Sequence, residues 1–128
     1  MSAPPRKRRD LESPIQAAIV ELIRVGYPTA LAYSIPNGGF ILEARVVAKL
    51  KWTGLLPGMP DLAIEWPGDH GFMEVKSKDG DTSSDQEDVH KILLGMGKRV
   101  VIVRSVDEAR AALDGWGVPS RIITGLAA

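Results

Sequence analysis

The chain contains no cysteine, which excludes disulfide bonds and thiolate metal sites. Any metal site must therefore use oxygen or histidine ligands, and we expect a cytoplasmic protein. No stretch approaches the roughly 18 consecutive apolar residues that a membrane helix needs, so we expect no membrane partner. The basic start of the chain is not followed by the apolar core of a signal peptide.

The chain also lacks a net charge, because 16 Lys and Arg balance 16 Asp and Glu. The charges are divided unevenly: residues 1–54 have eight basic and four acidic side chains, and residues 55–128 have eight and twelve. A basic front half suits contact with a polyanion, and an acidic back half suits metal ligands. A chance division in a neutral protein explains the same counts, so charge alone leaves both interpretations open.

At 128 residues the chain has the length of a single domain. We expect a flexible basic tail over residues 1–10 and one domain over residues 11–128. Hydrophobic periodicity and turn residues predict eight elements in the order helix, strand, helix, strand, strand, helix, strand, helix. The helices are predicted over 12–25, 42–51, 83–97 and after Ser105, and the strands over 29–35, 61–66, 71–77 and 99–104.

This order predicts an α/β fold with a mixed central sheet flanked by helices. Strands 61–66 and 71–77 should form a hairpin, and strand 99–104 should return parallel to one of them through a right-handed crossover. The β-branched residues of 99–104 are typical of a buried strand. We expect the three tryptophans, Trp52, Trp66 and Trp116, to pack in the interior, with base stacking as the lesser alternative. His70 and His90 are expected at the surface.

Two carboxylates and a lysine could meet in the predicted hairpin. Glu74 and Lys76 share one face of their strand because side chains alternate, and Asp61 opens the neighbouring strand. Together with waters and a backbone carbonyl near Val75, the carboxylates would give Mg²⁺ or Mn²⁺ an octahedron of oxygen ligands. Such an ion polarises a phosphate and activates water, while Lys76 would neutralise developing charge. Alternatively, a Glu-x-Lys pair is an ordinary surface ion pair, and an Asp after Pro is a turn residue.

These residues resemble a known family. Gly58-Met59-Pro60-Asp61 followed by Glu74-Val75-Lys76 resembles the signature of the PD-(D/E)xK nucleases, and more narrowly that of the virus-type replication-repair nuclease (VRR-NUC) group of phages and bacteria. The likeness covers residues 11 to about 119. Further matching segments are Glu12-x-x-x-Gln16, Pro36-Asn37-Gly38-Gly39, Ser83-x-x-Gln86, and the run from Arg104 to Ala109 after Gly97.

The resemblance implies a restriction-endonuclease-like core and assigns roles to individual residues. It makes Asp61 and Glu74 metal ligands, Glu12 a further metal contact from the first helix, and Lys76 the catalytic lysine. Gln86 matches a glutamine that points back toward the site. Read from the sequence alone, Gln86 is equally well explained as the capping-box partner of Ser83.

Basic and polar residues outside this set are candidates for DNA contacts. They are Arg45, Lys49 and Lys51 on the second predicted helix, Lys78 in the linker after the hairpin, and Asn37 in the Asn-Gly-Gly loop. Each basic residue could release a counterion from a phosphate, although a solvated helix face explains them too. Phe40-Ile41-Leu42 stands where relatives often carry basic residues, which departs from the family pattern.

We therefore expect a Mg²⁺- or Mn²⁺-dependent DNA endonuclease that selects branched DNA. A domain of this size encloses little of such a substrate, so we expect a homodimer with two sites on opposed strands. The main alternative is a nucleic-acid-binding module that keeps the nuclease fold without turnover. A metabolic phosphoesterase is a third possibility, and the sequence has no nucleotide-binding loop to support it.

Overall fold

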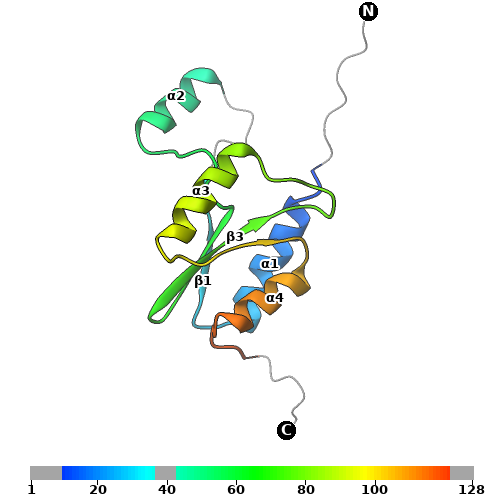
Figure 1. Ribbon diagram of the computed structural model, residues 1–128. Helices are drawn as coiled ribbons and strands as arrows, with labels where there is room; N and C mark the ends of the chain where they lie inside the picture. Colours follow the sequence, from blue (N-terminus) through cyan, green and yellow to red (C-terminus); the bar gives the residue numbers. More distant parts are fainter. Residues whose placement is uncertain (1–9, 37–42, 122–128) are drawn as a thin grey trace, which may run out of the picture.

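A computed structural model describes residues 10–36 and 43–121, and it has eight elements in the predicted order (Figure 1). The predicted basic tail up to residue 9 and Asn37 with its loop lie outside the described residues. No helix in the described part is long and apolar enough to cross a membrane. The elements are α1 (Ser13–Gly26), β1 (Leu31–Ser34), α2 (Ala44–Trp52), β2 (Leu62–Trp66), β3 (Asp69–Val75), α3 (Ser84–Gly95), β4 (Val100–Val103) and α4 (Val106–Gly115).

The four strands form one mixed sheet in the order β1-β2-β3-β4. Strand β2 is antiparallel to both β1 and β3, whereas β4 runs parallel to β3 after the chain has passed through α3. Helices α1 and α4 lie on one side of the sheet and α3 on the other (Figure 1). The predicted α/β class, the hairpin and the parallel return strand are therefore confirmed.

The hairpin is tighter than predicted. Only Pro67 and Gly68 separate β2 from β3, and Gly68 has a φ of +88°, which glycine adopts without a steric penalty. Strand β3 consequently begins at Asp69 and ends at Val75, two residues earlier at each end than the sequence pattern predicts. Lys76 still donates its backbone N–H to the Val103 carbonyl at 3.0 Å, so the strand alternation extends to this residue.

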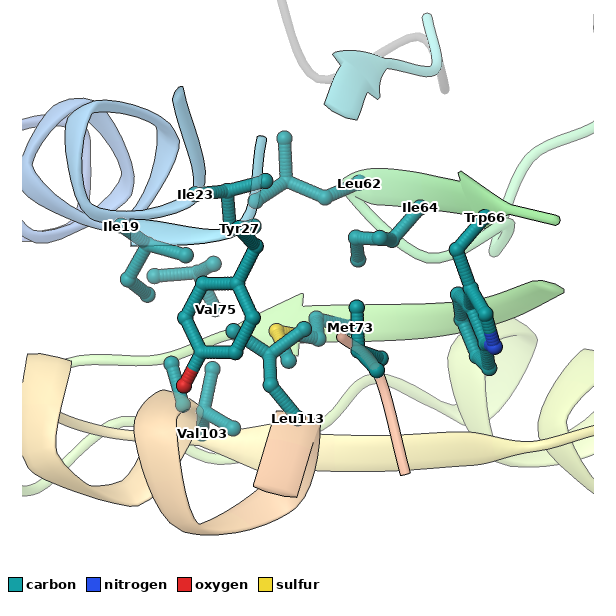
Figure 2. Close-up of a cluster of buried hydrophobic side chains, with 12 residues drawn as sticks. Ile19, Ile23, Tyr27, Leu62, Ile64, Trp66, Met73, Val75, Val103 and Leu113 are labelled. Atoms are coloured by element: carbon teal, nitrogen blue, oxygen red, sulfur yellow. The ribbon is translucent and has the colours of Figure 1, made fainter. Parts of the chain in front are cut away.

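The apolar core lies between the sheet and the helices α1 and α4 (Figure 2). Met73 and Val75 of β3 point into it and are fully buried, as are Ile19 and Ile23 of α1. The expectation that residues 99–104 form a buried strand is corrected for β4. The topology places this strand at a sheet edge, and its Ile102 is 37% exposed. A β-branched run reports strand propensity, and it does not tell an edge strand from a central one.

The tryptophans divide into a stacked pair and an exposed residue. Trp66 and Trp116 stack with ring centroids 5.8 Å apart, and Trp116 also lies directly over Gly71, which has no side chain to obstruct it. The prediction of a packing role is wrong for Trp52, which is 85% exposed. The reason is that α2 has no buried residue and stands away from the layers of the sheet (Figure 1).

Candidate functional site

Two charged residues at the end of β3 are buried. Glu74 is 1% exposed and Lys76 is 7% exposed, and they alternate with Met73 and Val75, which face the apolar core. Glu74 and Lys76 therefore lie on the opposite face of the sheet, the face that α3 covers (Figure 1). Lys76 Nζ is 3.7 Å from Glu74 Oε1. This burial contradicts the alternative of an ordinary surface ion pair.

Asp61 joins this pair from the residue immediately before β2. Its Oδ2 accepts a hydrogen bond from the Val75 backbone N–H at 2.8 Å, which holds the two strand ends together. The Asp61 carboxyl also lies within hydrogen-bonding reach of the Glu74 carboxyl. Burial, and next the negative charge of Asp61, raise the pKa of Glu74 to about 8, with the charge of Lys76 partly opposing the rise.

Gln86 connects the carboxylate to the lysine. Its Nε2 donates to Glu74 Oε1 at 2.6 Å, and its Oε1 accepts from Lys76 Nζ at 2.9 Å. The same Oε1 accepts from the Ser83 backbone N–H at 2.9 Å, and the Ser83 hydroxyl accepts from the Gln86 backbone N–H, which forms a complete capping box. Gln86 therefore caps α3 and also points toward the cluster, and the cap itself fixes the side chain over Glu74 and Lys76.

His90 is a member of the cluster that we predicted to be at the surface, and that prediction is wrong. It is 8% exposed, whereas His70 is partly exposed. His90 Nε2 lies 3.9 Å from Glu74 Oε2. Burial, and next the positive charge of Lys76, lower the pKa of His90. The sequence signal was present, because Gln86 and His90 are four residues apart and so share one face of α3.

The loop before Asp61 explains the glycine of the motif. Gly58 has a φ of +93°, and a Cβ atom there would collide with the backbone carbonyl of Asp85 in the first turn of α3. Pro60 is fully buried beside it. The loop is thus pressed against the start of α3, and this contact brings Asp61 to the cluster.

Glu12 lies on a cavity next to the cluster. It precedes α1, and it lines a volume of about 590 Å³ together with Lys76 and the loop 77–81. Arg104 shapes this loop, because its Nη1 donates to the Ser77 carbonyl at 2.7 Å and to the Gly80 carbonyl at 2.6 Å. The structure therefore brings Glu12 to the cavity that Lys76 lines. Its carboxylate lies close to Gly80 of the loop and forms no group of three metal-ligating side chains with Asp61 and Glu74.

The carboxylates of the cluster can be compared with the ligands that a divalent cation requires. Within residues 10–36 and 43–121, no three His, Asp or Glu side chains already surround one point. Mg²⁺ in proteins is usually held by one or two carboxylates together with waters and substrate phosphates, and Asp61 and Glu74 match that requirement. Glu74 Oε2 is fully buried without a hydrogen-bond partner in the described part of the chain, as expected for a ligand atom. Val75 contributes to the site through its backbone N–H, which donates a hydrogen bond to Asp61 Oδ2.

The candidate DNA-contact residues that the structure describes are all exposed. Arg45 forms an ion pair with Glu43 at 2.9 Å, and Lys49 and Lys51 lie in the last turn of α2. Lys78 follows β3 in the loop beside the cavity, two residues after Lys76. Asn37 lies outside the described residues.

Comparison of the chain with protein-family models, with curated proteins and with solved structures finds no match. The functional interpretation therefore depends on the site itself.

Proposed function

We propose that this protein is a metal-dependent DNA endonuclease with a PD-(D/E)xK core of the VRR-NUC type, acting in the cytoplasm. The observation that carries the proposal is the contact of the buried Glu74 and Lys76 with the partly buried Asp61 and Gln86 at one end of β3. Burying charged groups is costly, and apolar residues of similar volume often make a protein more stable at such positions. A cluster of this kind with a strongly perturbed carboxyl pKa favours a functional role.

The side chains have distinct roles in phosphodiester hydrolysis. A Mg²⁺ or Mn²⁺ ion bound here would polarise the scissile phosphate and activate the attacking water. Asp61 and Glu74 would hold the ion, and Gln86 orients Glu74 and Lys76 by binding both. Lys76 Nζ would stabilise the negative charge that develops on the phosphate. Glu12 would supply a further metal contact from the neighbouring cavity.

The proposed substrate is branched DNA bound by a homodimer. The exposed basic residues of α2 would contact phosphates outside the site, where each contact releases a counterion. One domain of 128 residues covers little of a DNA branch, whereas a dimer presents two sites to opposed strands. Exposed apolar side chains at the end of α3 support an interface between copies; they are Ile92 and Leu94 on the helix and Met96 at its C-cap.

Cleavage assays test this function. Wild type, Asp61→Asn and Lys76→Met are compared on labelled junction, flap and duplex DNA with Mg²⁺, Mn²⁺ or a chelator. Lys91→Met is the matched control, because Lys91 is an exposed lysine of α3. We expect cleavage by wild type and Lys91→Met only with metal, and none by the other two variants. Cleavage that survives the chelator or both site substitutions contradicts the proposal.

A binding module without turnover is the second candidate. It is favoured by the lack, among the described residues, of a ready group of three metal-ligating side chains. Binding of DNA without cleavage in any metal would establish it. Light scattering at micromolar concentration tests the homodimer separately, and a monomer there contradicts the proposed assembly.

A further inference from the structure

Two buried polar atoms beside the proposed ion site face each other without a hydrogen bond. Glu74 Oε2 and His90 Nε2 both lack a partner in the described part of the chain. They are 3.9 Å apart, which is too long for a hydrogen bond. The Glu74 side chain is 1% exposed and the His90 side chain 10% exposed. Buried polar atoms without partners are rare in folded proteins, and an ion is one of the few groups that satisfies both.

Several other polar atoms of the cluster have hydrogen-bond partners. Glu74 Oε1 accepts from Gln86, and Gln86 Oε1 accepts from Lys76 and from the Ser83 backbone. Asp61 Oδ2 accepts from the Val75 backbone. The side of Glu74 that faces His90 is therefore where this carboxylate is open to a further ligand.

We propose that His90 is a nitrogen ligand of the ion held by Glu74, and that it makes the site select Mn²⁺ over Mg²⁺. A neutral imidazole suits transition-metal ions, whereas Mg²⁺ prefers oxygen ligands throughout. The position of His90 on α3 is fixed by the same helix that carries Gln86, so the imidazole does not need to be recruited from a loop.

The simpler role for His90 is a hydrogen bond that positions Glu74, and it makes a different prediction. A positioning residue affects Mg²⁺ and Mn²⁺ alike, because both ions need the Glu74 carboxylate. A nitrogen ligand affects Mn²⁺ selectively. His90→Gln separates the two, since glutamine keeps a donor and offers an amide oxygen in place of the imidazole nitrogen.

The inference rests on the proposed function for its ion, and its test needs no DNA. Untagged protein is loaded with Mn²⁺ and studied by electron spin-echo envelope modulation, which detects nitrogen bound to the ion. His70→Gln is the control, and it leaves His90 as the single histidine, because the chain has two. We expect nitrogen modulation in wild type and in His70→Gln, and its loss in His90→Gln.

Affinity measurements by calorimetry give the second result. We expect His90→Gln to weaken Mn²⁺ binding about tenfold more than Mg²⁺ binding. If His90→Gln does not fold, labelling His70→Gln with ¹⁵N-histidine gives the answer, because the modulation must change with the isotope. No nitrogen modulation in wild type, no isotope effect, or an equal loss of both metals overturns the inference.

The outcomes also separate this inference from the proposed function. Metal-dependent cleavage without nitrogen modulation overturns the ligand role of His90 alone. Nitrogen modulation in a protein that cleaves no DNA supports the ligand role and contradicts the nuclease.

Discussion

The two faces of β3 are buried to the same degree and hold opposite chemistry. Met73 and Val75 are fully buried in the apolar core, and Glu74 and Lys76 are almost as inaccessible on the other face. Apolar burial stabilises the fold at about 25 cal/mol per Å² of surface removed from water. Burial of charged groups costs stability unless partners compensate. One strand therefore serves the fold with one face and the proposed reaction with the other.

Substitutions on the charged face should affect the reaction far more than the fold. Lys76→Met keeps the buried apolar stem and removes the ammonium group that contacts Gln86. We expect cleavage to fall about 10³-fold, by analogy with the loss of a single donor to transition-state charge. Single-turnover kinetics measures this, and retention of more than a tenth of the rate would show that Lys76 is not catalytic.

Substitutions on the apolar face should do the reverse. Met73→Ala opens a cavity among Ile64, Val103 and the other core residues. We expect the free energy of unfolding to fall by about 2–5 kcal/mol, with the cleavage rate of the folded fraction nearly unchanged. Urea denaturation gives the first quantity. A loss of cleavage without a loss of stability would remove the distinction between the two faces.

The contact between the loop before Asp61 and the start of α3 can be tested by substituting two glycines. Gly58 and Gly97 both have positive φ, +93° and +78°, and only Gly58 lies against another backbone. Alanine at either position costs about 1–3 kcal/mol for the strained conformation. We expect Gly58→Ala to lose further stability, and cleavage as well, because the start of α3 must move. Equal losses in the two variants would show that the contact with Asp85 is unimportant.

The smallest effect is expected deep in the core. The Tyr27 hydroxyl donates to Asp114 Oδ1 at 2.7 Å, which ties the end of α1 to α4. Tyr27→Phe should reduce the free energy of unfolding by about 0.5–1.5 kcal/mol, the usual net value of a hydrogen bond. Cleavage should not change. A thermal melt with a cleavage assay checks both, and a large loss of activity would extend the functional region beyond the charged face.

Much of the fold could be predicted because its signals are local. Turn residues, caps and apolar periodicity are set by neighbours in the chain, and they placed all eight elements in order. The capping box of Ser83 and Gln86 is an example. Strand exposure could not be predicted in the same way, because β4 is an edge strand only by virtue of the sheet order.

The site was predictable where residues share a strand and less so where they meet across elements. Alternation placed Glu74 and Lys76 together, and the hairpin brought Asp61 to them. His90 shares a face of α3 with Gln86, but it was missed because the packing of this helix face against Glu74 is a tertiary feature. Glu12 reaches the neighbouring cavity, and no local pattern fixes where the start of α1 lies against the loop 77–81.

The raised pKa of Glu74 has a consequence for stability. The folded protein retains a proton on Glu74 up to about pH 8, whereas the unfolded chain loses it near 4.5. The folded state thus binds more protons in this interval, so stability falls as the pH rises from about 4.5 to about 8. Glu74→Gln removes this loss, and a bound cation should offset it in the wild type.

The most direct test of a functional charged face is the melting temperature of wild type and Glu74→Gln at pH 7.5, with Mn²⁺ and with a chelator. We predict that in the chelator Glu74→Gln melts several degrees above wild type, because glutamine removes the cost, a few kcal/mol, of protonating Glu74 on folding at this pH. Mn²⁺ should raise the melting temperature of wild type and leave that of Glu74→Gln unchanged. The assignment would be contradicted if Mn²⁺ did not change the melting temperature of wild type and wild type melted above Glu74→Gln in both conditions. Glu74 would then be a structural residue.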